Sequence, residues 1–107
     1  MACRDATGVQ SFPSVSATPP SVRPLITEAR TFWELIELRA AATPDDVMLL
    51  DADGRWFTFQ EIRDWAERVA AGLHARGVQR DSPVTWQLPT RIETVVASFA
   101  LSRLGAV

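Results

Sequence analysis

Apolar side chains recur three and four residues apart between residues 58 and 77, which is the spacing of one face of an α-helix. These apolar positions are Phe59, Ile62, Ala66, Val69 and Leu73. Thr58 and Glu61 fit a capping box, in which each side chain accepts a hydrogen bond from the other residue's backbone amide. Arg76 and Gly77 are typical of a helix end, because a cation suits the negative end and glycine tolerates the left-handed conformation. The pattern predicts a helix that begins after Thr58 and ends near Arg76.

A second Thr-x-x-Glu pattern, Thr31 to Glu34, predicts another helix start. The stripe expected to be buried consists of Phe32, Leu35, Ile36, Arg39 and Ala40. Thr43 precedes Pro44, and a residue before proline is steered out of the helical region, so the helix should end there. Two short apolar runs follow, 47–50 and 56–58. They flank a polar turn that ends in Gly54, which predicts a β-hairpin.

The last part of the chain has the order strand, helix, strand. Val84–Leu88 predicts a strand, Pro89 ends it, and Thr90 to Glu93 repeats the capping-box pattern before an apolar helix. Gly105–Val107 is typical of an exit from that helix into another strand. Two parallel strands need such a crossover, so Val84–Leu88 is expected inside a parallel sheet whose second strand is missing. An unpaired strand of this kind would be an aggregation liability.

Several segments in this order resemble the start of the large adenylating domain of the AMP-forming ligases. That family includes the acyl-CoA synthetases, the adenylation domains of peptide synthetases and the luciferases. The matching segments are Thr43–Asp45, Trp56–Ile62, Ala70–Leu73, Arg76–Val78, Val84–Pro89 and Ala100–Val107. The resemblance implies an α/β fold for residues 25–107, as an incomplete, truncated N-terminal portion of that domain. Its expected elements are three helices, a β-hairpin and one parallel-type strand.

In this family a carboxylic acid reacts with ATP and Mg²⁺ to give an acyl-adenylate, and CoA then displaces AMP. Proteins hold nucleotide phosphates with glycine-rich backbone loops backed by lysine or arginine. Each glycine of this chain is isolated, and the chain contains no lysine. The family's two functional lysines, one ending the phosphate loop and one in the small C-terminal domain, have no counterpart here. We therefore expect no catalytic, cofactor-binding or metal-binding residue in this chain, with ATP, Mg²⁺ and CoA implied for a longer parent.

Composition narrows the class of protein further. An apolar fraction of 47% with 22% charged residues is ordinary for a globular protein. A net charge of −2 argues against a nucleic-acid partner, because no basic stripe could replace phosphate counterions. The longest apolar run, Thr94–Leu101, is too short to cross a bilayer, so no transmembrane segment is expected. Cys3 is the only cysteine, which excludes an internal disulfide and fits a cytoplasmic location.

Residues 1–24 show neither helical nor strand periodicity. Prolines interrupt this stretch at positions Pro13, Pro19, Pro20 and Pro24, and they prevent helix propagation. One interpretation is a disordered tail. The other is a mis-assigned start codon, with the protein beginning near Leu25, and the sequence leaves both open.

Four groups of residues are candidates for chemistry. His74 has no nucleophile nearby in the sequence, so an exposed helix residue is the better interpretation. Cys3 has neither a histidine partner nor metal-ligand spacing and is interpreted as a spectator thiol. The acidic residues Asp45, Asp46, Asp51 and Asp53 lack the spacing of a calcium loop, and turn formation explains them better. The tryptophans Trp33, Trp56, Trp65 and Trp86 lie on different expected elements, which favours core packing or contact with a missing domain.

Pro89 and Thr90 form a fifth candidate, at the turn between the expected strand and helix. Ligands of α/β proteins bind beyond strand carboxyl ends, and the amides after Thr90 could face an anion. The expected capping box would already use some of those amides, which disfavours this role.

Three functional hypotheses follow. The first is the N-terminal fragment of an ATP-dependent fatty or carboxylic acid–CoA ligase, catalytically inactive by itself. The run Trp86–Pro89 favours CoA ligases over a piece of a peptide-synthetase adenylation domain. The second is a non-catalytic partner that completes a split ligase by docking onto a separately encoded remainder. The third is a truncated product without function.

Overall fold

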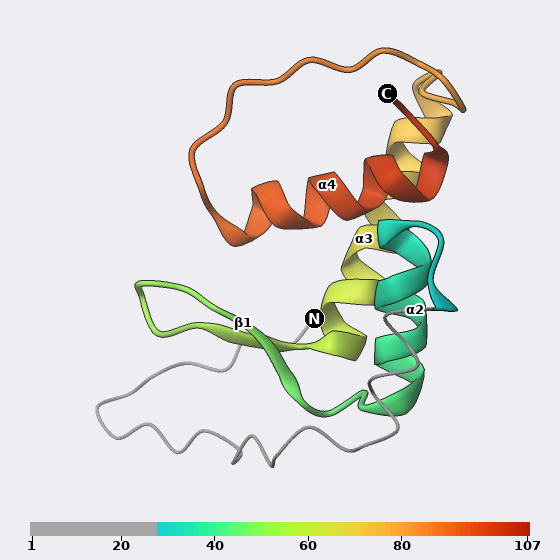
Figure 1. Ribbon diagram of the computed structural model, residues 1–107. Coiled ribbons are helices and arrows are strands. Elements are labelled where there is room, and N and C mark those ends of the chain that lie inside the picture. Colours follow the sequence, from blue (N-terminus) through green and yellow to red (C-terminus); the bar gives the residue numbers. More distant parts are fainter. Residues whose placement is uncertain (1–27) are drawn as a thin grey trace.

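A computed structural model describes residues 28–107 of the chain, so the expected tail at 1–24 and Cys3 lie outside the described residues. Within that range the elements are α2 (Phe32–Ala42), β1 (Val47–Leu50), β2 (Trp56–Thr58), α3 (Phe59–Ala75) and α4 (Ile92–Leu104). Figure 1 shows α3 as the central helix, with α2 beside its first half and α4 crossing it. The described residues therefore form an α/β unit of three helices and a two-stranded antiparallel sheet.

The start of α3 confirms the expected capping box. The Glu61 amide donates to the Thr58 hydroxyl at 3.2 Å, and the Thr58 amide donates to the Glu61 carboxylate at 2.9 Å. At the other end, Gly77 adopts a left-handed φ of +99°, and its amide donates to the His74 carbonyl at 3.0 Å. The predicted bounds of this helix are thus confirmed.

Helix α2 begins at the expected threonine and buries Ile36 and Ala40 as expected, but Trp33 is buried in place of Phe32. The Glu34 amide donates to Thr31 Oγ1 at 3.1 Å, whereas the Glu34 carboxylate accepts from the Arg30 amide at 2.6 Å and not from Thr31. Its buried residues are Trp33, Ile36 and Ala40. Phe32 was expected in this stripe but is 72% exposed. Because α2 has apolar residues on two adjacent faces, its packing partners and not its periodicity select the buried one.

The third capping box does not form. Helix α4 has Arg91 as its N-cap, without a side-chain hydrogen bond to the helix start. The Glu93 carboxylate lies 3.5 Å from the Arg55 guanidinium of the hairpin. The Thr94 hydroxyl donates to the Pro89 carbonyl at 2.7 Å. The expectation at Thr90 was wrong because these contacts position the turn and draw the glutamate away.

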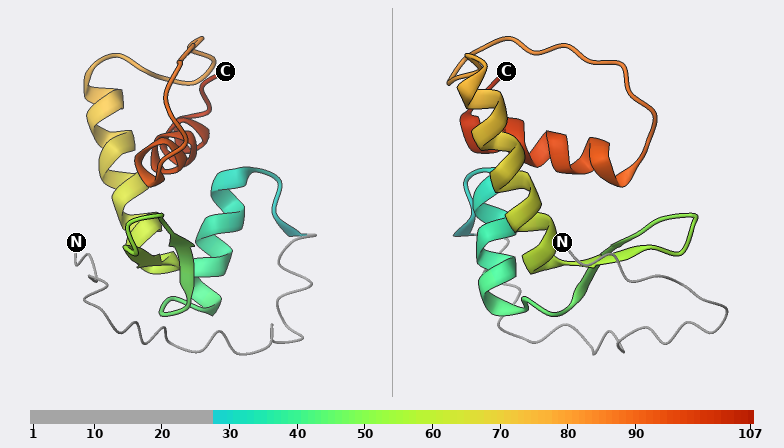
Figure 2. Two further views of the ribbon diagram at one scale, coloured as in Figure 1. Left: turned by 90° about the vertical axis from the view of Figure 1, so that its left-hand side faces the viewer. Right: turned by 180° about the vertical axis from the view of Figure 1, so that it is seen from behind.

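The expected hairpin is present and extends from the start of α3 (Figure 2). Its strands pair Val47 with Thr58 and Leu50 with Trp56, with an irregularity between residues 47 and 49. Phe57 is 2% exposed and joins the core. The core cluster combines this hairpin with the helices through Trp33, Ile36, Phe57, Ile62, Ala66, Ile92 and Val96.

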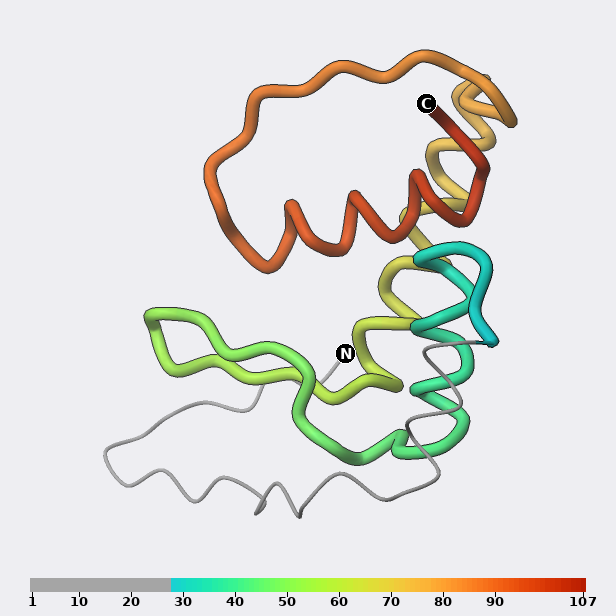
Figure 3. The backbone as a smooth tube through the Cα atoms, in the orientation of Figure 1, coloured from blue at the N-terminus to red at the C-terminus, as the bar shows by residue number. Residues whose placement is uncertain are grey.

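Val84–Leu88 does not form a strand ladder among the described residues, contrary to the strand predicted there. Figure 3 shows residues 78–91 as a wide arc between the end of α3 and the start of α4. Two backbone hydrogen bonds nevertheless join this arc to the end of the chain. The Val107 amide donates to the Ser82 carbonyl at 2.9 Å, and the Val84 amide donates to the Val107 carbonyl at 2.8 Å. In a pair of parallel strands, one residue forms hydrogen bonds to the two residues that flank its opposite partner, and these two bonds have that pattern.

Candidate functional site

His74 is exposed near the end of α3 and borders a cavity of about 290 Å³. The lining residues are Glu67, Ala70, Ala71, His74, Arg103 and Leu104. None of them carries a hydroxyl or thiol that an imidazole could activate. The interpretation of His74 as an exposed helix residue is confirmed.

Asp51 organises the hairpin turn. Its Oδ1 accepts hydrogen bonds from the amides of Asp53 at 3.0 Å and Arg55 at 2.9 Å, and its Oδ2 accepts from Arg55 Nε at 2.5 Å. Desolvation raises the pKa of Asp51, but the hydrogen bonds and charge of Arg55 outweigh it, so this pKa lies below its ordinary value. These contacts confirm the turn-forming interpretation of Asp51.

Asp45 and Asp46 lie in the connection between α2 and β1. The Asp46 amide donates to the Thr43 carbonyl at 3.3 Å, and the Asp46 carbonyl accepts from the Phe59 amide at 3.0 Å.

Among residues 28–107, no three side chains of histidine, cysteine, aspartate or glutamate come together in a way that could hold a metal ion.

The four tryptophans differ in how deeply they are buried. Trp33 and Trp56 are buried at 6% and 8% exposure, and Trp65 packs against the core with its ring centroid 5.7 Å from that of Phe57. Trp86 is 41% exposed on the arc between α3 and α4. The structure therefore does not bring these residues together as an aromatic platform.

The turn at Pro89 and Thr90 faces the hairpin. A cavity of about 270 Å³ separates them, lined by Asp51, Ala52, Asp53, Arg55, Thr90, Arg91 and Ile92. An anion at the start of α4 would meet the carboxylates of Asp51 and Asp53 as well as the two arginines. This mixed lining does not favour an anion site, although the expected reason, an occupied capping box, was wrong.

An apolar cavity of about 220 Å³ was not predicted from the sequence. It is lined by Phe32, Leu35, Ile36, Arg39, Met48, Phe59 and Phe99. The Arg39 guanidinium lies 4.8 Å from the centre of the Phe59 ring, and its Nη1 is buried without a hydrogen bond in the described part of the chain. Four separate elements contribute these residues, so no local sequence signal could have revealed the cavity.

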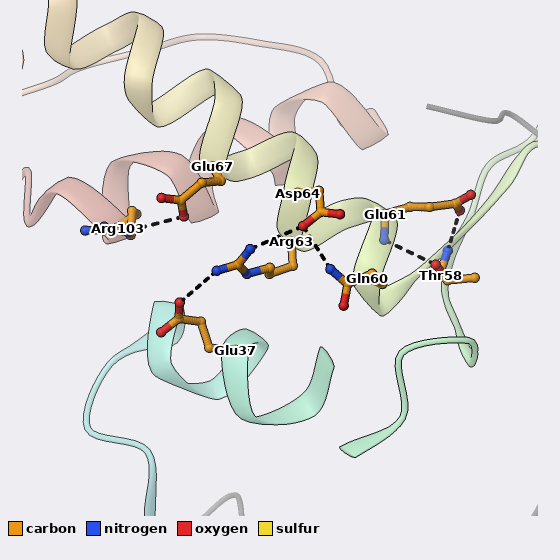
Figure 4. Close-up of polar contacts among 8 residues, drawn as sticks. All are labelled: Glu37, Thr58, Gln60, Glu61, Arg63, Asp64, Glu67 and Arg103. Carbon is orange, nitrogen blue, oxygen red and sulfur yellow. Dashed lines mark hydrogen bonds and ion pairs between the residues drawn. The ribbon is translucent and has the colours of Figure 1, made fainter. Parts of the chain in front are cut away.

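A network of ion pairs links the helices (Figure 4). Arg63 on α3 lies 3.3 Å from Glu37 on α2 and 3.2 Å from Asp64. Desolvation lowers the pKa of Arg63, but these carboxylates outweigh it, and the pKa is raised. Arg103 on α4 lies 3.4 Å from Glu67, and both arginines lie within 5.9 Å of the centre of the Trp33 ring. The network positions the helices around Trp33 and offers no reacting group.

The described glycines are spread over separate elements. Gly54 lies in the hairpin turn, Gly72 within α3, and Gly77 and Gly105 at two helix ends. A phosphate loop needs several consecutive backbone amides turned toward one anion, and no two of these glycines share a loop.

No helix within residues 28–107 has both the length and the apolar character needed to cross a membrane.

The chain is similar to known AMP-forming enzymes. Residues 36–107 match the model of the family described as AMP-binding enzyme. Acetyl-coenzyme A synthetase 2 of Zygosaccharomyces bailii is 35% identical over 85 residues, which are 75% of this chain and 13% of that protein. The 4-chlorobenzoate–CoA ligase of an Arthrobacter species is 37% identical over 79 residues, which are 73% of this chain and 15% of the ligase.

The same likeness holds for the fold. The N-terminal subdomain of Klebsiella oxytoca NpsA superimposes with a TM-score of 0.69 at 23% identity, over 74% of this chain and 20% of that one. The chain therefore spans only a small part of the length of the relatives it matches.

Proposed function

The chain belongs to the family of AMP-binding enzymes, and on this premise we propose that it forms the N-terminal part of the adenylating domain of an ATP-dependent carboxylic acid–CoA ligase. In the complete ligase, the carboxylate would attack the α-phosphate of ATP to give an acyl-adenylate and pyrophosphate. The thiol of CoA would then displace AMP. The carrying observation is the family match over residues 36–107, together with CoA ligases among the relatives.

Residues 28–107 would serve this reaction as scaffold. The core around Ile62 and the Trp33 network hold α2, α3 and α4 together, and no two of the described glycines share a loop. We therefore expect the 107-residue chain alone to form no acyl-adenylate, since the groups that hold ATP, Mg²⁺ and CoA would come from the remainder. The single cysteine is consistent with a cytoplasmic parent.

A chimera tests the proposal directly. Residues 36–107 would replace the matching segment of the Arthrobacter 4-chlorobenzoate–CoA ligase, and exchange of labelled pyrophosphate into ATP would be measured with 4-chlorobenzoate. The expected result is retained exchange in the chimera and none in the ligase lacking the segment. A folded but inactive chimera, or acid-dependent exchange by the 107-residue chain alone, would overturn the proposal.

A further inference from the structure

The apolar cavity bounded by α2, β1, α3 and α4 contains one charged side chain. Six of its seven lining residues are apolar: Phe32, Leu35, Ile36, Met48, Phe59 and Phe99. The seventh is Arg39, whose Nη1 is buried and forms no hydrogen bond within residues 28–107. Pockets for small molecules have this composition, in which apolar walls surround a few polar groups that fix the orientation of the ligand.

Arg39 differs from the other half-buried arginines, which within the described part of the chain are Arg55 and Arg63. Each of those two has a carboxylate oxygen of the chain within 3.5 Å, whereas no carboxylate of residues 28–107 forms an ion pair with Arg39. The Phe59 ring, 4.8 Å away, attracts the guanidinium charge but offers no oxygen to the Nη1 hydrogens. A buried charge is costly unless it is paired, so the cavity holds an unused site for an anion.

The lining of the cavity indicates which anion fits. The planar fork of guanidinium donors matches the two oxygens of a carboxylate. A phosphate group carries about two negative charges at pH 7, and the apolar walls would leave its other oxygens without donors. The same walls suit an aromatic ring or a short alkyl chain. A volume of about 220 Å³ limits the ligand to a small molecule.

We infer that this cavity binds a small monocarboxylate with an aromatic or short aliphatic body. Its carboxylate pairs with Arg39, and its body lies between Met48 and Phe99. Such a ligand contacts α2, β1 and α4 at once, so its binding stabilises the folded chain. The inference goes beyond the proposed function, because it concerns binding by these residues without ATP and without any reaction.

Met48 provides a reporter inside the cavity, since Met1 and Met48 are the only methionines of the sequence. The full 107-residue chain, labelled with ¹³C at its methionine methyl groups, is titrated with benzoate and with hexanoate and observed by NMR. The Met48 signal should shift saturably with both. Benzyl alcohol, which has the ring but no charge, should bind about tenfold or more weakly, because it lacks the charged hydrogen bond to Arg39.

Arg39→Met tests the role of the cation. Methionine keeps an apolar side chain beside Phe59 without the charge, so the preference for benzoate over benzyl alcohol should disappear. The urea midpoint of the ligand-free variant should be unchanged or higher, because an unpaired buried charge has been removed. Arg68→Met, at an exposed position of α3, is the matched control and should retain the preference.

Four results would overturn the inference. They are a Met48 signal that does not shift saturably, equal affinity for benzoate and benzyl alcohol, a preference that survives in Arg39→Met, and a lower urea midpoint of that variant, which would make Arg39 a structural residue. The chimera that tests the proposed function is a separate experiment. Its outcome does not bear on the cavity, because Phe32 and Leu35 lie outside the exchanged residues 36–107.

Discussion

Two threonines in the same sequence pattern make different contacts at the starts of α3 and α4. Thr58 and Glu61 bond reciprocally, whereas the residues after Thr90 leave α4 without a side-chain cap. Both helix starts carry the same Thr-x-x-Glu pattern. The difference arises because Glu93 lies against Arg55, a residue that is distant in sequence.

Thr58→Ala should lower the free energy of unfolding by about 1 kcal/mol, because the Glu61 amide loses its acceptor at the start of α3. Thr90→Ala is the matched control and should change it by less than about 0.5 kcal/mol. Urea denaturation of both variants measures the two effects. An equal or larger loss at Thr90 would contradict the absence of a cap at α4.

Asp51 should make the hairpin sensitive to acid. Its pKa in the folded chain lies below the value in the unfolded chain, which is about 3.9 for aspartate. The ionised form therefore contributes stability that is fully present above that pH and is lost as the pH falls through the lower, folded value. Arg55→Gln should move the pKa of Asp51 upward, measured from its carboxyl chemical shift, whereas substitution of exposed Arg68 by Gln should not. An unchanged Asp51 titration in Arg55→Gln would refute the assignment.

Sequence periodicity predicted which helices and strands form better than it predicted which of their side chains are buried. The helices and the hairpin appear where turn residues and apolar spacing placed them, although α4 lacks the cap expected at Thr90. Whether Phe32 or Trp33 is buried on α2 was not predictable, because both are apolar and only the approach of α3 and α4 selects Trp33. The strand at Val84–Leu88 lacks a ladder in the described residues because a strand depends on a partner, which local sequence does not supply. The same reasoning applies to the apolar cavity, whose walls come from four elements.

Replacing a glycine by alanine should change the stability in opposite directions inside a helix and at a helix end. A Cβ at Gly72 would meet no atom within 4 Å, and glycine inside a helix is unfavourable, so Gly72→Ala should stabilise the chain by about 0.5–1 kcal/mol. Gly105 has a φ of +74°, and a Cβ there would lie 3.3 Å from Arg80 Cγ, so Gly105→Ala should destabilise it by about 1–2 kcal/mol. Thermal unfolding of both variants measures the sign. Stabilisation by Gly105→Ala would contradict the described end of α4, and destabilisation by Gly72→Ala would contradict the open space at Gly72.

For the molecule as a whole, the buried core is small. Within the described residues, the largest side chains below 2% exposure are Ile62 and Val96, while Phe32, Leu50, Trp86, Leu88 and Val107 are all large and exposed. Chains of this size bury only about 60% of the surface that they expose when unfolded. Burial therefore offsets little more than the conformational entropy lost on folding.

We accordingly expect the isolated chain to be marginally stable or molten. Its thermal transition should be broad, and its near-ultraviolet dichroism weak in comparison with its helical far-ultraviolet signal. Circular dichroism in both regions measures this. A sharp, cooperative transition with strong tryptophan dichroism would show that residues 28–107 fold as an independent domain.

The unequal exposure of the tryptophans makes the arc observable by fluorescence. Trp33 and Trp56 are enclosed by the core, whereas Trp86 projects from the arc. Iodide in the surrounding water should therefore quench the emission of Trp86 before that of the buried pair. Anything that covers the arc would shield this one indole and shift its emission to shorter wavelength, so the chain carries its own optical reporter of the surroundings of the arc.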